Sequence, residues 1–113
     1  MKLTEIIDRL SLDVFTPVTD AETEVSGGYV GDLLSSVLAS AMPGNLWITI
    51  QHHANVVAVA QVTGLAAVLI VEGKRPDDAM RDQAKSSGVV LLGSTESAFE
   101  VAGRLYDLLV AKR

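Results

Sequence analysis

The sequence contains no cysteine. This absence excludes disulfide frameworks, thiolate zinc sites and cysteine nucleophiles, and it fits a protein of the reducing cytoplasm. Long apolar runs are missing as well. The N-terminus lacks the extended apolar segment of a signal peptide, and no stretch approaches the ~20 apolar residues needed to span a bilayer. We therefore expect a cytoplasmic protein with no membrane insertion.

Positive charge is scarce, because Lys and Arg number 9 against 14 Asp and Glu, for a net charge of −5. Nucleic-acid affinity comes largely from clustered Lys and Arg, so we expect no nucleic-acid partner. Only 20% of the residues are charged and 49% are hydrophobic. We expect part of the apolar surface to meet a second subunit in a homodimer. The length of 113 residues suits one domain, residues 1–113.

The second half of the chain alternates strand and helix patterns. Nearly continuous apolar strands that alternate with helices are typical of a parallel sheet buried on both faces. The pattern predicts an α/β fold with three layers, a mostly parallel central sheet and helices on both faces. The expected elements are strand 46–50, helix 54–62, strand 66–71, helix 77–87, strand 89–92 and helix 97–110.

The first part of the chain is less regular. Residues 3–10 carry apolar residues at helical spacing, and residues 13–15 form a short strand pattern. The segment 24–30 predicts a strand that is broken or bulged by its two glycines, which also permit a close backbone approach. Asp32 is placed to cap a helix that Pro43 and Gly44 end.

Helix boundaries are marked by capping residues further along. Asp77 follows a proline at one helix start, and Gly88 suits the left-handed residue that ends this helix. Residues 97–100 form a capping box at the next start. One stripe of the last helix, more typical of a core or dimer interface than of a ligand site, consists of Phe99, Ala102, Tyr106 and Leu109.

Candidate ligand-binding residues lie in three loops that follow the predicted strands. In open parallel sheets, ligands bind beyond the carboxyl ends of the strands, near unsatisfied amides of helix N-termini. Such a site would take a small polar or anionic ligand. Its predicted residues are Gln51, His52, His53, Asn55, Gly73, Ser94 and Thr95. Two alternatives stay open: Asn55 suits helix capping equally well, and Lys74 and Arg75 are more typical of a solvated loop than of an anion clamp.

The adjacent histidines His52 and His53 raise the question of a metal. Neighbouring residues in a strand point to opposite faces, and at a helix start they diverge by ~100°, so we expect them not to hold one metal together and assign no metal site. The helix dipole disfavours a charged imidazole, which favours a neutral hydrogen-bonding role for at least one ring.

Known catalytic motifs are not found in the sequence. The glycine-rich segment 27–32 lacks the Gly-Lys-Ser/Thr ending of a phosphate-binding loop and the G-x-G-x-x-G of a dinucleotide fold. Neither a G-x-S-x-G elbow nor an H-E-x-x-H motif occurs. We expect a protein that is not an enzyme, with no catalytic residue assigned, and the sequence identifies no cofactor.

The chain from Gly44 to Leu109 resembles the DRTGG domain, a regulatory module of some phosphotransacetylases that also occurs as a stand-alone protein labelled HPr-kinase-like. The resemblance rests on residues 43–46 leading into an apolar strand, on 67–70 entering a glycine loop, and on Gly88 before a further strand. Upstream, residues 25–30 resemble the first strand of the family.

The residues that name the family are changed in this chain. His52-His53 stands where the family has its Asp-Arg pair, and Val71-Glu72-Gly73 stands in place of Thr-Gly-Gly. The resemblance implies a compact, dimeric α/β domain that senses a small molecule or a partner, without kinase activity.

Three functional hypotheses follow. The first is a non-enzymatic regulatory domain that binds a small polar or anionic metabolite or nucleotide at the strand ends. The second is a protein-interaction accessory subunit of a metabolic or redox complex that uses apolar helix faces such as Val101, Leu105 and Leu108. The third is a small transferase or hydrolase with a histidine base.

Overall fold

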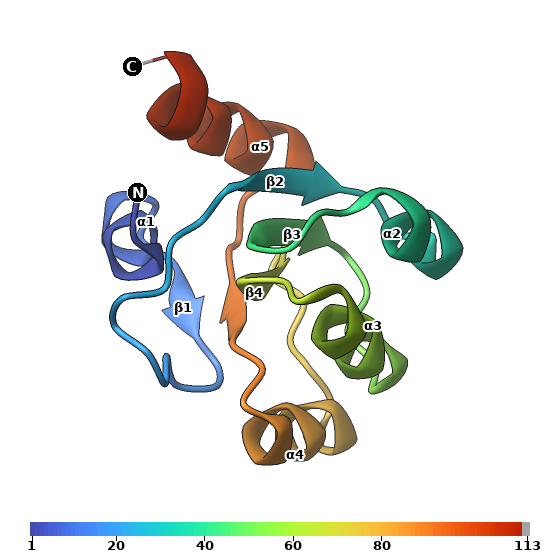
Figure 1. Cartoon of the computed structure of the whole chain (residues 1–113). Coiled ribbons are helices and arrows are strands. Elements are labelled where there is room, and N and C mark those ends of the chain that lie inside the picture. The colour runs from blue at the N-terminus through green and yellow to red at the C-terminus, as the bar shows by residue number, and fades with distance from the viewer. Residues whose placement is uncertain (112–113) are drawn as a thin grey trace.

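In the computed structural model, which describes residues 1–111, a 5-stranded sheet has the order β1-β5-β4-β3-β2 (Figure 1). Strands β2 to β5 are parallel, and β1 joins β5 in the antiparallel sense. The strands are β1 (Asp13–Val14), β2 (Gly27–Val30), β3 (Asn45–Thr49), β4 (Ala67–Ile70) and β5 (Leu91–Gly93). The helices are α1 (Leu3–Arg9), α2 (Leu34–Ser40), α3 (Asn55–Thr63), α4 (Asp78–Ser87) and α5 (Ala98–Tyr106), which continues as the π-helical segment η1 (Asp107–Ala111).

Helices cover both faces of this sheet, as the sequence pattern predicts. Helices α1 and α5 lie on one face, and α2, α3 and α4 lie on the other (Figure 1). Side chains alternate along β3, so that Leu46 and Ile48 pack with α1 and α5 whereas Trp47 packs with α2 and α3. Both faces are therefore apolar, which explains why every residue of β3 and β4 is buried. The predicted three-layer α/β fold is confirmed.

Glycines 27 and 28 form a regular strand, so the predicted break or bulge is wrong. Strand β2 pairs with β3 residue by residue, from Gly27 opposite Asn45 to Val30 opposite Ile48. A side chain at position 28 would place its Cβ 3.0 Å from Leu105 Cδ2 of α5. The predicted close approach is thus confirmed, because α5 packs directly onto the backbone at Gly28.

Two of the expected N-terminal caps and the expected C-terminal cap form, and one N-terminal cap does not. Asp77 and Ser97 accept hydrogen bonds from Met80 N–H and Glu100 N–H at the starts of α4 and α5, and Gly88 ends α4 with φ of 73°. Asp32 caps no helix, because Leu33 holds the N-cap position of α2. The Asp32 carboxylate instead accepts hydrogen bonds from Thr49 Oγ1 at 2.7 Å and from Ile50 N–H at 2.9 Å.

The last helix presents different residues to solvent than the interaction hypothesis requires. Val101 and Leu105 are buried against the sheet, so they cannot bind a partner. Phe99 is 89% exposed, and Tyr106 of the same predicted stripe is also exposed. The side of α5 that faces solvent is therefore not the side that the second hypothesis names, because Phe99 and Tyr106 are exposed there instead of Val101 and Leu105. Within residues 1–111, no helix is long and apolar enough to cross a membrane.

Candidate functional site

The carboxyl ends of β3, β4 and β5 carry the three predicted loops on the same edge of the sheet. The chain leaves β4 towards α4 on one face and leaves β5 towards α5 on the opposite face (Figure 1). Adjacent parallel strands whose connections diverge in this way create the usual ligand crevice of open α/β sheets. In this chain the corresponding position lies between the β4–α4 and β5–α5 loops.

Backbone hydrogen bonds bridge these two loops. Gly73 N–H donates to the Ser94 carbonyl at 2.9 Å, and Glu72 N–H donates to the Glu96 carbonyl, also at 2.9 Å. The bridge requires left-handed backbone at Glu72 and Gly73, with φ of 61° and 70°. The structure thus brings together the predicted residues Gly73 and Ser94, but it uses their backbone groups to tie the loops rather than leaving them free for a ligand.

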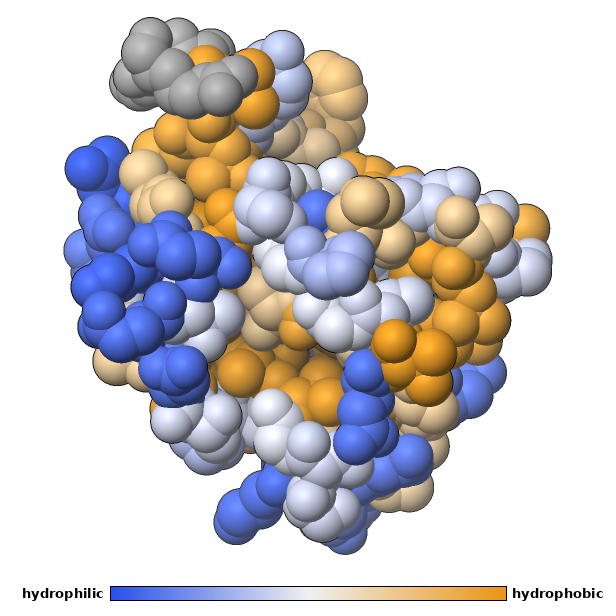
Figure 2. Space-filling model, viewed as in Figure 1, coloured by the Kyte–Doolittle hydropathy of each residue, from blue (hydrophilic) through white to orange (hydrophobic). Residues whose placement is uncertain are grey.

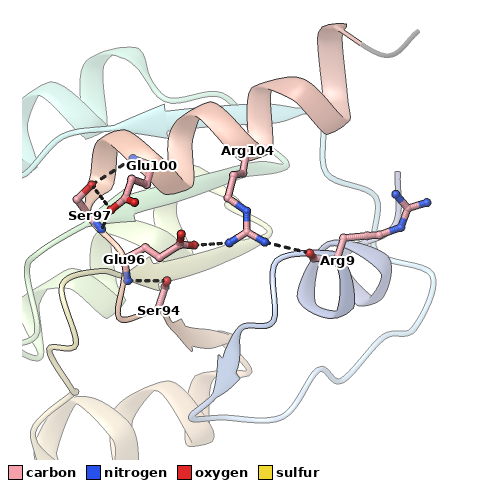
Figure 3. A network of polar contacts seen from close by, with 6 residues as sticks. All are labelled: Arg9, Ser94, Glu96, Ser97, Glu100 and Arg104. Carbon is pink, nitrogen blue, oxygen red and sulfur yellow. Dashed lines mark hydrogen bonds and ion pairs between the residues drawn. The ribbon is translucent and has the colours of Figure 1, made fainter.

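The Ser94 hydroxyl belongs to a polar network beside this bridge (Figure 3). Its Oγ accepts a hydrogen bond from Glu96 N–H at 3.1 Å, and Ser94 is buried. The Glu96 carboxylate forms an ion pair with Arg104 of α5, whose guanidinium also donates to the Arg9 carbonyl of α1 at 3.3 Å. This network fixes the β5–α5 loop against the two helices on its face of the sheet.

On the other side of the β4–α4 loop, Asp77 connects the histidines to α4. Asp77 N–H donates to the His52 carbonyl at 3.2 Å. His53 Nδ1 lies 3.0 Å from Asp77 Oδ2, while Asp77 Oδ1 accepts from Met80 N–H at 2.8 Å. One carboxylate therefore caps α4 and orients the His53 ring.

The same contacts act on the ionisation of Asp77. The hydrogen bond from His53 and then that from Met80 N–H lower the pKa of the Asp77 carboxyl below its ordinary 3.8. Burial acts in the opposite direction, and the charges of His53 and His52 add to the lowering. Asp77 is therefore held in its ionised form, as a lasting acceptor for the imidazole.

The two imidazole rings lie against each other, with centroids 4.3 Å apart and planes tilted by 38°. The expectation that the side chains of His52 and His53 diverge is therefore wrong, because the backbone turns between the end of β3 and the start of α3. His52 Nδ1 lies 3.2 Å from the Ile50 carbonyl, and His53 Nδ1 pairs with Asp77. When a neutral ring donates from Nδ1 in either contact, its Nε2 is an acceptor. Among residues 1–111, no group of three His, Cys, Asp or Glu side chains is placed to hold a metal ion.

The remaining predicted residues surround this pair less closely. Gln51 Nε2 donates to the Asp32 carbonyl at 2.7 Å, which ties the loop to the end of β2. Asn55 is exposed in the first turn of α3, where Ala54 holds the N-cap position, so the capping alternative for Asn55 is wrong. Thr95 is exposed at the tip of its loop. Arg75 lies over the Phe15 ring, with Cζ 4.9 Å from the ring centroid.

Two hollows of the surface lie elsewhere, along α5. An open groove of about 820 Å³ and a smaller hollow of about 170 Å³ share the lining residues Val30, Ala102 and Tyr106. Neither is lined by a predicted site residue. These two hollows therefore lie apart from the predicted site at the strand ends, between α5 and the edge strand β2, and their exposed lining is mainly apolar.

Sequence reasoning missed the connecting residues of this site. The sequence predicts Asp77 only as a helix start and Asp32 only as a cap, and it does not reveal their contacts with His53 and Thr49. Glu96 and Arg104 were not singled out, although they form an ion pair. The two residues are 8 positions apart. Sequence patterns reveal ion pairs within a helix, where the partners are three or four positions apart.

Comparison with protein-family models and with curated proteins gave no match. Among solved structures, the chain is similar to the crystal structure of the CBS and DRTGG domains of the regulatory region of Clostridium perfringens pyrophosphatase, complexed with the activator diadenosine tetraphosphate. The TM-score is 0.69 at 17% sequence identity, and the match covers 91% of this chain. The two share a fold.

This likeness supports part of the expected resemblance. It shows that the chain has the fold of part of that region, which contains a DRTGG domain, and at 17% identity it concerns the fold alone. The match covers 44% of the length of that neighbour. Membership of the DRTGG family as a stand-alone protein stays a prediction.

Proposed function

We propose that residues 1–113 form a single, non-enzymatic regulatory domain that works in the cytoplasm as a homodimer. It binds a small polar or anionic metabolite at the carboxyl ends of the parallel strands, with a nucleotide as the first candidate. The binding residues are Gln51, His52, His53, Asn55, Gly73, Ser94 and Thr95, and no catalytic residue or metal takes part.

The observation that carries this proposal is the adjacent pair of imidazoles, of which Asp77 orients the His53 ring. His53 is 63% exposed although its Nδ1 is fixed by the carboxylate 3.0 Å away. An oriented and accessible ring costs little conformational entropy on binding, because its rotamer is already selected. Each Nε2 offers a hydrogen bond to a ligand, and an exposed imidazole face can stack on a nucleobase.

The backbone hydrogen bond between the β4–α4 and β5–α5 loops supports the part of the proposed site formed by Gly73, Ser94 and Thr95. Because Gly73 N–H and Ser94 C=O bind each other at 2.9 Å, they hold the two loops at a set separation. Their role is to position the exposed groups on either side, Thr95 on one loop and Lys74 on the other. An ammonium and a hydroxyl at this edge suit an anionic group of the ligand.

The neighbouring pyrophosphatase region supports the regulatory class, since it was crystallised with a nucleotide activator. A regulatory neighbour likewise favours a non-catalytic role for this chain. The absence of clustered basic residues in the sequence keeps nucleic acid out of the proposal.

The test is thermal unfolding of the purified protein with a panel of nucleotides, acyl phosphates, nicotinamide cofactors and divalent metals. A compound present at ~100 times its dissociation constant adds roughly 2.7 kcal/mol when it binds only the native state. The expected result is a shift with a nucleotide that the double variant His52→Ala/His53→Ala loses and the control Gln83→Ala keeps. A shift that persists in the double variant, or a flat panel, contradicts the proposed site.

A second candidate function is that of a protein-interaction subunit. The groove of about 820 Å³ along α5 favours it, because Phe99 is 89% exposed beside this groove. Phe99→Ser would then abolish co-purification of a defined partner while the ligand panel stays flat. Unchanged co-purification in this variant would contradict the second candidate.

A further inference from the structure

The distribution of charge along the chain is uneven. No Asp, Glu, Lys or Arg occurs from Leu33 to Val71, so all 14 acidic and 9 basic residues lie outside this stretch. The stretch comprises α2, β3, α3 and β4. Because β3 and β4 are buried, its contribution to the surface comes from the two helices and their connecting turns.

The uncharged stretch forms one continuous surface, since α2 and α3 pack side by side on one face of the sheet (Figure 1). Gly44 N–H donates to the Gly64 carbonyl at 2.9 Å, which joins the ends of the two helices. Large apolar side chains stand out from this surface, which we call the α2–α3 face. They are Leu33 (65% exposed), Leu38 (50%), Met42 (63%) and Val62 (78%).

Figure 2 shows the same asymmetry from one side. Strongly hydrophilic residues gather over α1 and the loop that follows it, and again around α4, whereas the surface over α2 and α3 is mostly apolar or weakly polar. An apolar surface that lacks charge is typical of the centre of a protein interface and unusual for a surface that stays in water.

The absence of charge also limits what can cover this face. A partner that brings charged groups would bury them with no opposite charge to meet, which is costly. The same face of a second copy brings only apolar and small polar side chains. Contact through this face keeps the acidic residues of the two chains, each with a net charge of −5, away from each other.

The groove along α5 is a poorer place for self-association. Among the described residues, its lining includes the carboxylates Glu96 and Glu100 and the guanidinium of Arg104, which pairs with Glu96. Two copies that met there would place acidic groups opposite each other. The charge pattern therefore favours contact between two copies at the α2–α3 face and disfavours it at the groove along α5.

We propose that a second copy of the chain docks on the α2–α3 face, so that the same residues of both copies meet across a two-fold axis. This inference rests on the homodimer of the proposed function and assigns its interface. The short helix α2, with the sequence LSSVLAS, has no charged pairs of its own. It gains its stability from packing on both sides, against α3 and against the second copy.

The experiment is sedimentation velocity over a range of protein concentrations, without any ligand. The wild-type chain is expected to sediment as a dimer. Leu38→Lys and Met42→Lys are expected to raise the dimer dissociation constant at least ~100-fold, because each places a charge twice near the two-fold axis. Both side chains are at least half exposed in one chain, so the fold should tolerate lysine.

Phe99→Lys is the matched control, since it adds the same charge at an exposed apolar position of α5. It is expected to leave the dimer intact. A monomeric wild-type chain, dimers that survive both α2–α3 substitutions, or dissociation by Phe99→Lys would each overturn the assignment. Ligand-induced shifts in thermal unfolding are measured separately on the monomeric variants. The proposed interface can therefore be contradicted while the ligand site is supported, and the ligand site can be contradicted while the interface is supported.

Discussion

His53 Nδ1 lies 3.0 Å from Asp77 Oδ2, although the two residues are 24 positions apart in the chain. The contact ties the turn that precedes α3 to the first turn of α4. Asp77 can make it because its other oxygen caps α4. The orientation of the imidazole is thereby coupled to the capping of a helix, and changes at either residue act on both.

The first prediction concerns the pH dependence of stability through Asp77. Its pKa is lower in the folded chain than the ordinary 3.8, so its ionised form stabilises the fold above pH 3.8. This contribution is lost as the pH falls through the folded-state pKa. Asp77→Asn keeps a capping oxygen and lacks the charge. We expect the variant to melt at a lower temperature than wild type near neutral pH, with the gap closing below pH 3.8.

Thermal melts between about pH 2.5 and pH 7 check this expectation. Asp82→Asn is the control, because it removes an exposed charge of the same helix without touching His53. A gap between wild type and Asp77→Asn that stays constant through the acid range would contradict the role assigned to the carboxylate.

The second prediction contrasts two glycines. A Cβ at Gly93 would lie 2.5 Å from Phe15 Cε2, so Gly93→Ala should destabilise the fold, by about 1–3 kcal/mol as for other overpacked sites. A Cβ at Gly103 in α5 meets nothing within 4 Å. Gly103→Ala should therefore stabilise the fold by roughly 0.5–1 kcal/mol, since glycine is unfavourable inside helices.

Urea unfolding of both variants measures the two free energies of unfolding. The test is whether the two changes in free energy of unfolding have opposite signs. If Gly93→Ala is neutral, Phe15 does not pack on the β5 backbone as described.

The third prediction concerns the buried hydroxyl of Thr16, which is 2% exposed. Thr16 Oγ1 donates to the Val89 carbonyl at 2.7 Å and accepts from Leu91 N–H at 2.8 Å. Thr16→Val keeps the shape and leaves both backbone groups without a partner, which should cost ~1–3 kcal/mol. Thr16→Ser should retain most of the stability. Equal unfolding midpoints for the valine and serine variants in urea would show that the hydroxyl is not used.

Much of the fold follows from local patterns in the sequence. The helices and strands from β3 onwards were predicted because their apolar runs are nearly continuous and their ends carry Asp77, Gly88 and Ser97. The wrongly predicted bulge at Gly27 and Gly28 has a tertiary cause. Gly28 leaves room for Leu105 of α5, which is close in space and far away in the sequence. The burial phase of α5 was likewise hidden, because apolar residues lie on more than one side of that helix.

The candidate site was less predictable. The carboxyl ends of β3, β4 and β5 lie within one residue of the predicted ends. Parallel topology brings the three loops to one edge. What each loop does there depends on contacts between loops, such as the bridge from Gly73 to Ser94. Asp32 shows the same limit, because a residue suited to capping instead binds Thr49, the end of a strand that follows later in the chain.

The central claim is that a nucleotide-like ligand binds beside the adjacent rings of His52 and His53. Amide chemical-shift mapping of the ¹⁵N-labelled chain during titration with a nucleotide measures this most directly. We predict saturable shifts that concentrate at residues 51–55 and 72–77, with smaller changes around Ser94 and Thr95. Shifts confined to the groove along α5, or none at saturating nucleotide, would contradict the claim.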